Sequence, residues 1–335
     1  MLGENIKSGW QFSREAVMKK SSEILLTDHQ IRKTKIQKQR FREWLTEYLS
    51  ESGYTFTEDW YSQRGCNFIA GDVRTAETVI SAHYDTPPNF IFPAVIGFSS
   101  WFSFLISQFL MILPFAAVIM LYIFLVSFLS LSGYFLLAVP AVSFAYSLQI
   151  MFGAANRHNA NDNTSGTAVL ISVLEQLPAE ERHKVCVVFF DQEESGLIGS
   201  KHFYKKYKKY MDDKPLINFD CVTDGRTLNF ISKKKFRNSV YCALLREAAE
   251  KSAENTDRKI RFADALSNVY MSDQMSFPVS SGVAAAKKIP VFGYYIDRIH
   301  SRFDTKFDSE NISVLTQTAV RLISALPCSS PAQKK

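Results

Sequence analysis

A long uncharged segment constrains this chain more than any other feature of its sequence. From Thr86 to Asn156, about 71 residues pass without an Asp, Glu, Lys, Arg or His. A helix needs only about 20 consecutive apolar residues to cross the hydrocarbon core of a bilayer. A pair of buried core helices is the alternative, but a globular core does not require so long a run without one charge. The segment therefore favours insertion into a membrane.

The length of the segment predicts two membrane-spanning helices joined by a turn. Ile91 to Phe152 would extend about 93 Å as a helix, enough for two crossings of a roughly 30 Å core. We place the spans near Ile96–Phe128 and Gly133–Met151, with the break near Ser130. The expected structure is a two-helix transmembrane hairpin.

The remaining sequence alternates between helical and extended patterns. Continuous apolar strands between helices are typical of a sheet that is covered on both faces. We therefore expect an α/β fold with a mainly parallel or mixed sheet, covered by helices on both faces and interrupted by the hairpin. Strands are expected near Tyr54–Phe56, Asn67–Ala70, Thr78–Ala82, Val185–Phe190, Leu216–Phe219, Leu228–Ile231, Val283–Ala286 and Val291–Ile296, and helices at Asp28–Ser50, Ser165–Leu177, Leu197–Tyr210, Asn238–Ser252 and Ser309–Leu326.

Composition outside the hairpin excludes several classes of protein. The formal net charge of +6 comes without an aromatic-interleaved basic patch or a nucleic-acid motif, so no nucleic-acid partner is expected. The five cysteines are scattered and contain no C-x-x-C pair, which is typical of a reducing compartment. Met1 to Lys20 has no apolar core followed by a small-residue cleavage site, so no secretory signal is expected.

Acidic residues and histidines recur where the predicted strands end. Ligands of open α/β sheets bind at the carboxyl ends of strands, and carboxylate and imidazole groups suit zinc or related divalent ions. Each short motif alone is weak, because such residues also form surface pairs, solvated turns and helix caps. Their order and topology favour a site. The residues concerned are His83 and Asp85, Asp191, Glu193 and Glu194, Asp220, Asp297 and His300, with Asp162 just before the Ser165 helix.

In order along the chain, these motifs resemble those of the co-catalytic zinc exopeptidases of peptidase family M28. The resemblance covers roughly Ser50 to Leu326 apart from the apolar insert. The segments that carry it are His83-Tyr84-Asp85-Thr86, Asn161-Asp162-Asn163-Thr164-Ser165-Gly166, Asp191-Gln192-Glu193-Glu194-Ser195-Gly196, Asn218-Phe219-Asp220, Ser272-Asp273-Gln274 and His300-Ser301-Arg302-Phe303-Asp304-Thr305.

The resemblance implies a site with two divalent metal ions, of which zinc is preferred. Glu193 is expected to be the general base that takes a proton from a metal-bridging water. Asp85 is expected to hold the far nitrogen of His83 and fix its ring. A cis peptide bond is implied between Asp162 and Asn163. Asp162 would bridge the two ions, His83 and Asp220 would complete the ligands of one, and Glu194 and His300 those of the other.

Two departures from the family pattern stand out. The family's Ser-Asp-His motif here reads Ser272-Asp273-Gln274. The family usually has a short loop between the His-x-Asp motif and the bridging aspartate, whereas here about 76 residues separate Asp85 from Asp162. Tyr270 lies near the place where some members have a tyrosine that stabilises the tetrahedral oxyanion. The sequence does not establish whether Tyr270 aligns with that tyrosine.

The resemblance implies a zinc aminopeptidase with a peptide substrate, and the hairpin would anchor it in a membrane. Two alternatives remain open: a glutaminyl-cyclase-like acyltransferase, which shares the fold with a single catalytic zinc, and a catalytically inactive membrane scaffold. The intact ligand sets and the presence of Glu193 favour the peptidase. The expected organisation is an N-terminal helix and the first part of the catalytic domain at 1–89, the hairpin at 90–153, the rest of the catalytic domain at 154–327 and a tail at 328–335.

The hairpin also restricts the topology. His83 precedes it and Asp162 follows it, so both reach the same metal only if the number of crossings is even. Lys and Arg in the flanking parts favour a cytoplasmic catalytic domain. The site is then expected close to membrane lipid, which would restrict it to membrane-proximal or apolar peptides. Small residues in the spans allow self-association into a homo-oligomer.

Overall fold

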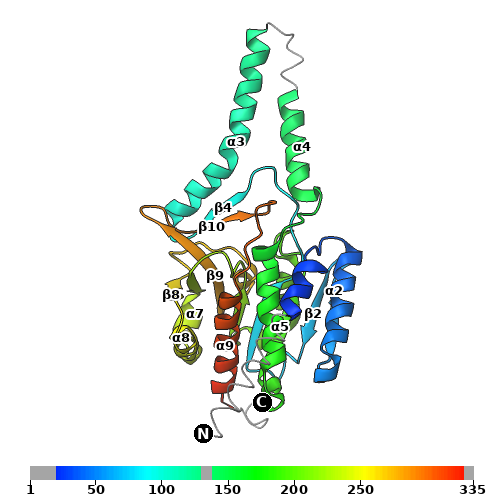
Figure 1. Ribbon diagram of the computed structural model, residues 1–335, viewed down its shortest axis with the longest axis vertical. Helices are drawn as coiled ribbons and strands as arrows, with labels where there is room; N and C mark the ends of the chain where they lie inside the picture. Colours follow the sequence, from blue (N-terminus) through cyan, green and yellow to red (C-terminus); the bar gives the residue numbers. More distant parts are fainter. Residues whose placement is uncertain (1–19, 130–137, 328–335) are drawn as a thin grey trace.

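The computed structural model describes residues 20–129 and 138–327. These residues form a sheet covered by helices, from one end of which two helices, α3 and α4, project (Figure 1). The predicted break near Ser130, the first residues of the predicted second span and the tail at 328–335 lie outside the described residues.

The sheet is mixed and has ten strands. Its order is β1-β2-β5-β3-β6-β9-β10-β4, with β7 paired to β9 and β8 paired to β7. The central strands β5, β3, β6 and β9 run parallel, and antiparallel pairs lie on both sides of them. The bounds are β1 Phe56–Trp60, β2 Cys66–Ala70, β3 Thr78–His83, β4 Ala94–Gly97, β5 Val185–Phe190, β6 Leu216–Phe219, β7 Thr227–Ser232, β8 Lys259–Asp264, β9 Ser280–Ile289 and β10 Gly293–Ile299.

Helices cover both faces of this sheet, as the sequence predicts. Side chains of a strand point alternately to its two faces. In β5, Val187 and Phe189 pack with residues of α2, α5 and α9, while Val188 and Phe190 pack with Phe203 of α6 on the opposite face. The main helices are α2 Lys35–Tyr48, α5 Gly166–Gln176, α6 Ile198–Met211, α7 Lys234–Arg237, α8 Val240–Ala253 and α9 Ser309–Ala325. The predicted α/β fold with helices on both faces is confirmed.

The predicted helix at Asp28–Ser50 is wrong at its start. Helix α2 begins at Lys35, because Thr34 and Gln37 form a capping box in which each side chain bonds the other residue's backbone. Residues 20–27 form a separate helix, and the residues between the two helices are not helical.

The uncharged segment begins with a strand rather than a helix. Ala94–Gly97 forms β4, which pairs antiparallel with β10. Helix α3 then spans Trp101–Phe128, with Ser100 as its cap, so the predicted start near Ile96 is too early. Helix α4 spans Ala138–Phe152.

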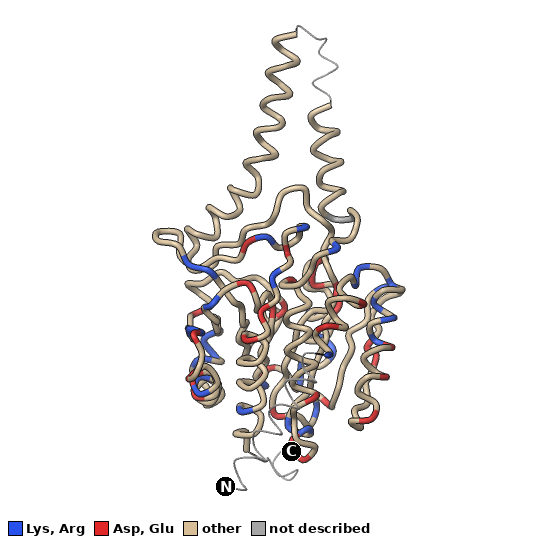
Figure 2. The backbone as a smooth tube through the Cα atoms, viewed as in Figure 1, with Lys and Arg blue, Asp and Glu red and all other residues tan. Residues whose placement is uncertain are grey.

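Helix α3 is exposed along most of its length. It is the one helix among the described residues that is long and apolar enough to cross a membrane, and only 6% of its most apolar window is buried. This exposure contradicts the alternative of a buried core helix. Figure 2 shows that α3 and α4 carry no Lys, Arg, Asp or Glu, whereas the sheet and its covering helices carry many.

The two ends of the insert are attached to the sheet domain. Pro88 and Ala155 form an antiparallel bridge. Ser99 Oγ accepts a hydrogen bond from the backbone N–H of Tyr294 at 3.0 Å and donates to the carbonyl of Phe292 at 3.2 Å. The base of α3 therefore lies beside β10, the strand that leads to His300.

Candidate metal centre

The topology brings three acidic or histidine segments to one edge of the sheet. Strand β3 ends at His83 and lies between the parallel strands β5 and β6. The turn with Glu193 and Glu194 follows β5, and Asp220 follows β6. Because the carboxyl ends of parallel strands lie at the same edge, these side chains converge.

Asp162 lies between two imidazoles. Its Oδ1 is 3.3 Å from Nε2 of His83, and its Oδ2 is 2.9 Å from Nε2 of His300. Each histidine also has a second carboxylate beside it: Asp220 Oδ1 is 3.5 Å from His83 Nε2, and Glu194 Oε2 is 3.4 Å from His300 Nε2. Two triads of candidate ligands thus share one carboxylate, and the ligand atoms within each lie within 4.8 Å of one another.

The cluster fits a divalent cation. Two imidazoles and three carboxylates are a donor set that suits zinc. Buried Oε1 of Glu194, Oδ1 of Asp220 and Nδ1 of His300 have no hydrogen-bond partner. Burying charged oxygens without partners is costly, and a bound cation would compensate the carboxylates.

The turn that carries Asp162 is held in place by the carboxylate of Asp304. It lies in the irregular turn Ala160–Ser165, and the expected cis peptide bond between Asp162 and Asn163 is confirmed. The backbone N–H groups of Asn161 and Asp162 donate to the carboxylate oxygens of Asp304 at 2.8 and 3.0 Å. The sequence motif at His300 contains Asp304, but nothing in the motif alone assigns it this role.

Asp85 contacts both the glutamate turn and the ring of His83. Its Oδ1 and Oδ2 accept hydrogen bonds from the backbone N–H groups of Glu193 and Glu194, at 3.0 and 3.3 Å. The Nδ1 atom of His83 lies 3.1 Å from the Asp85 carbonyl and 3.6 Å from the Asp85 carboxylate. The carbonyl and the carboxylate of Asp85 thus both face the far nitrogen of His83, and the carboxylate also orients the glutamate turn.

Electrostatics at the cluster favour bound protons when no metal is present. Burial, together with the charges of Asp273, Asp220 and Asp162, raises the pKa of Glu193 well above its usual value. Burial and the neighbouring carboxylates of Asp162 and Glu193 do the same to the pKa of Glu194. Burial alone would lower the pKa of His83, but the carboxylates around it outweigh burial and raise it. Carboxylate oxygens of Glu193 and Glu194 and a ring nitrogen of His83 lie within 4.8 Å of one another.

Tyr270 and Gln274 support the site rather than open into it. The Tyr270 hydroxyl donates to the backbone carbonyl of Asp220 at 2.9 Å. Gln274 donates to the carbonyl of Tyr270 and accepts from Asn218. Oxyanion stabilisation by Tyr270 is therefore not supported by this arrangement. Asp297 lies within β10 and pairs with Lys287, outside the cluster.

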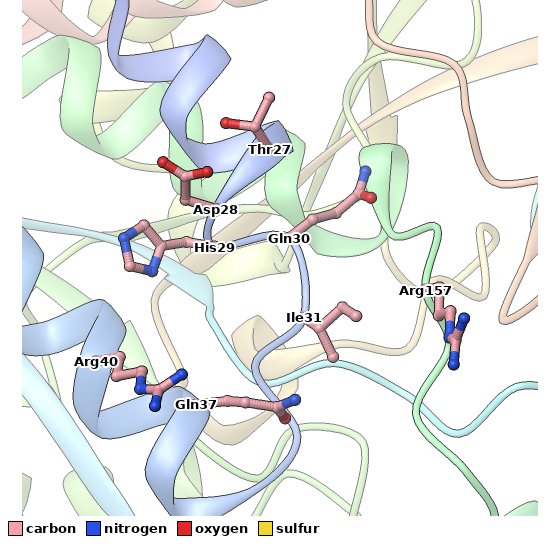
Figure 3. Close-up of a pocket in the computed structure, with 8 residues that line it drawn as sticks. All are labelled: Thr27, Asp28, His29, Gln30, Ile31, Gln37, Arg40 and Arg157. Atoms are coloured by element: carbon pink, nitrogen blue, oxygen red, sulfur yellow. The ribbon is translucent and has the colours of Figure 1, made fainter.

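The segment before α2 packs against the site. Arg32, which is fully buried, donates to the carbonyl of Tyr84 at 2.5 Å and to Oγ1 of Thr164 at 3.3 Å. The same segment lines a polar pocket of about 260 Å³ together with Arg40 and Arg157 (Figure 3). None of the residues lining that pocket belongs to the metal-ligand cluster.

Comparison with known families identifies the chain. The model of "Peptidase family M28" matches residues 146–323, which is more than half of the sequence. The chain belongs to peptidase family M28. Family membership confirms the resemblance seen in the sequence and indicates a hydrolase that acts on peptides. No curated protein sequence matches this M28 chain.

Solved structures share the M28 fold of this chain. The LapA aminopeptidase of Legionella pneumophila is 12% identical, with a TM-score of 0.53 over 92% of this chain and 70% of that one. The glutaminyl cyclase of Porphyromonas gingivalis is 15% identical, with a TM-score of 0.55 over 93% and 96% of the two chains. The glutaminyl cyclase of Fimbriiglobus ruber is 14% identical, with a TM-score of 0.55 over 93% and 95%. At these identities the likeness shows the fold alone.

Proposed function

We propose that this M28 chain is a membrane-anchored, zinc-dependent aminopeptidase that hydrolyses the amino-terminal bond of peptides. One observation carries the proposal: the two oxygens of Asp162 face His83 and His300, at 3.3 and 2.9 Å. A carboxylate between two imidazoles, each with a further carboxylate beside it, is the arrangement that two neighbouring cations need.

Each side chain of the cluster has a proposed role. Zinc at this site would supply Lewis acidity and lower the pKa of water. Glu193 accepts the proton of the attacking water and passes it to the departing amine. Asp85 orients Glu193 through the backbone bond at 3.0 Å. Two cations would be held by His83 and Asp220 on one side, Glu194 and His300 on the other, and Asp162 between them.

The substitution Glu193→Gln tests this proposal, because it keeps the shape of the side chain but removes its basicity. We expect kcat on aminoacyl-anilides to fall by about 10²- to 10⁴-fold. The zinc content of the purified protein, measured by mass spectrometry, is expected to stay at the wild-type value. Full activity of the Gln variant would refute the role of Glu193.

A glutaminyl-cyclase-like acyltransferase is the second candidate. The observation that favours it is that solved glutaminyl cyclases share the fold over nearly their whole length. Peptides with an amino-terminal Gln distinguish the two reactions, since a cyclase releases ammonia and leaves pyroglutamate, whereas an aminopeptidase releases free Gln. We expect free Gln and two zinc ions per chain.

The proposed organisation follows from the attachment of the insert. We propose that residues 90–153 form a hairpin that crosses the membrane twice, between the two parts of the catalytic domain at 1–89 and 154–327. Both parts then lie on the same side, proposed to be the cytoplasm because they carry the Lys and Arg residues. Helix α3 supports this proposal by its length and exposure.

A further inference from the structure

An apolar cavity lies between the two projecting helices, in the halves of them nearer the sheet. Its volume is about 310 Å³, and it lies between α3, α4 and the segment that follows β3. Phe90 and Phe92 line it from that segment, Met111 and Phe115 from α3, and Ile150 from α4. Pockets of this size hold small ligands or single large side chains.

The cavity adjoins the candidate metal centre through one residue. Phe90 is both a wall of the cavity and a neighbour of His300, whose imidazole meets the Phe90 ring edge-on with centroids 4.7 Å apart. The backbone N–H of Phe90 also donates to the carbonyl of His300 at 2.7 Å. Phe90 is therefore the residue through which the cavity adjoins the metal centre.

The chemistry of the lining selects the occupant. Among the described residues that line the cavity, none is Asp, Glu, Lys, Arg or His, and Gln108 and Tyr146 are the polar ones. Tyr146 stacks on Phe115 with ring centroids 4.6 Å apart, and this pair closes the space between α4 and α3. A charged group placed there would lose its hydration without finding an opposite charge, whereas an apolar side chain would gain free energy from leaving water.

We propose that this cavity binds a large apolar side chain of the peptide substrate, at one of the two residues that flank the scissile bond. The inference rests on the proposed peptidase function, and it makes the insert part of substrate selection. Peptides with Phe or Leu beside the scissile bond are then preferred over peptides with Ala.

Two tryptophan substitutions on α4 test the proposal. Ile150→Trp fills the cavity. Leu148→Trp is the matched control: Leu148 is 41% exposed and does not line the cavity. Successive helix residues are about 100° apart, so Leu148 lies on the side of α4 opposite to Ile150. Both variants are purified in detergent, and thermal unfolding checks that they fold.

The first measurement is kcat/KM for peptides in which either flanking residue is Phe, Leu or Ala. For Ile150→Trp we expect the preference for Phe over Ala to fall by about 10- to 100-fold, the loss expected when a large apolar side chain is no longer buried. The value for the Ala peptide is expected to stay within about twofold, and Leu148→Trp is expected to match the wild type. An unchanged preference in Ile150→Trp, or the same loss in both variants, would overturn the proposal.

The second measurement does not depend on catalysis. Protein stripped of metal by a chelator is titrated with fluorescently labelled Phe and Ala peptides, and binding is followed by anisotropy. We expect stronger binding of the Phe peptide in the wild type and in Leu148→Trp, but not in Ile150→Trp. If this pattern holds while metal-loaded protein cleaves nothing, the peptidase proposal fails and the cavity proposal stands. If the metal-loaded protein cleaves Phe and Ala peptides equally well, the cavity proposal fails and the peptidase proposal stands. A co-purified phospholipid that the Phe peptide does not displace would show that the cavity holds a lipid chain, which also overturns the proposal.

Discussion

Lys38 Nζ lies 2.7 and 2.8 Å from the two carboxylate oxygens of Asp191, and both side chains are buried. The Asp191 carboxylate also accepts from the backbone N–H groups of Cys66 and Gln192. Asp191 begins the turn that carries Glu193. Helix α2 therefore helps to position the proposed general base through one buried ion pair.

Replacing Lys38 by Met is expected to leave Asp191 buried without its counter-ion. Breaking a buried pair in this way costs about 3–5 kcal/mol of unfolding free energy. We expect chemical denaturation to show a loss of this size, accompanied by a lower kcat. The control is Lys35→Met on the same helix, where the side chain is exposed and the expected change is within about 0.5 kcal/mol. Equal stability of the two variants would contradict the role of the ion pair.

Removing one proposed ligand at a time is expected to remove one ion. Asp220→Asn affects the triad of His83, and Glu194→Gln affects the triad of His300. We expect two zinc ions per wild-type chain and about one in each variant, measured by mass spectrometry after gel filtration. Asp297→Asn is the control, because Asp297 pairs with Lys287 outside the cluster. A single zinc in the wild type would favour the cyclase-like alternative.

Metal affinity is expected to increase with pH. In the metal-free protein the pKa values of His83, Glu193 and Glu194 are raised, so these groups keep their protons to higher pH than they would in water. A cation requires unprotonated ligands, so its binding releases protons and strengthens as pH rises through the raised pKa values. Titration calorimetry at pH 7 in two buffers of different ionisation enthalpy measures this release. Identical heats in both buffers would show that no proton is released.

The proposed hairpin predicts the behaviour of the chain in membranes. We expect the protein to stay in the membrane fraction after alkaline carbonate washing. Val118→Lys places a charge near the middle of α3, where insertion costs about 2.5–3.5 kcal/mol, and is expected to weaken this retention. An accessibility tag inserted at Gly133 is expected on the side of the membrane opposite to a tag at the C-terminus. Both tags on one side would exclude two crossings.

The interior of the sheet could be predicted from local patterns. Strands β5 and β6 begin and end at the predicted residues, because each is a continuous apolar run that a parallel sheet buries on both faces. Strand β8 has no such run, since it lies beyond β7 and is only partly buried. Strand β4 lies within an apolar segment where strand and helix have the same composition, so only its pairing with β10 distinguishes it.

Some residues of the candidate site could be predicted from the sequence, and others could not. Residues in the short motifs, such as His83 and Asp162, could be predicted because the motifs place them at strand and helix ends. Lys38 and Asp304 could not, because each acts on a partner more than a hundred positions away. A lysine on an amphipathic helix is ordinarily solvated, and only the packing of α2 against the sheet makes this one a buried counter-ion.

The bridge between Pro88 and Ala155 has a consequence for how such a chain can fold. Because the inserted segment leaves and re-enters the sheet domain at this bridge, the parts of the chain before and after it lie as close as if a short loop joined them. The entropy lost in closing a loop grows only with the logarithm of its length, by about 0.6 kcal/mol for each doubling. A long insert therefore adds little to the free energy needed to assemble the sheet, provided that its apolar surface is buried, as it would be in a lipid bilayer.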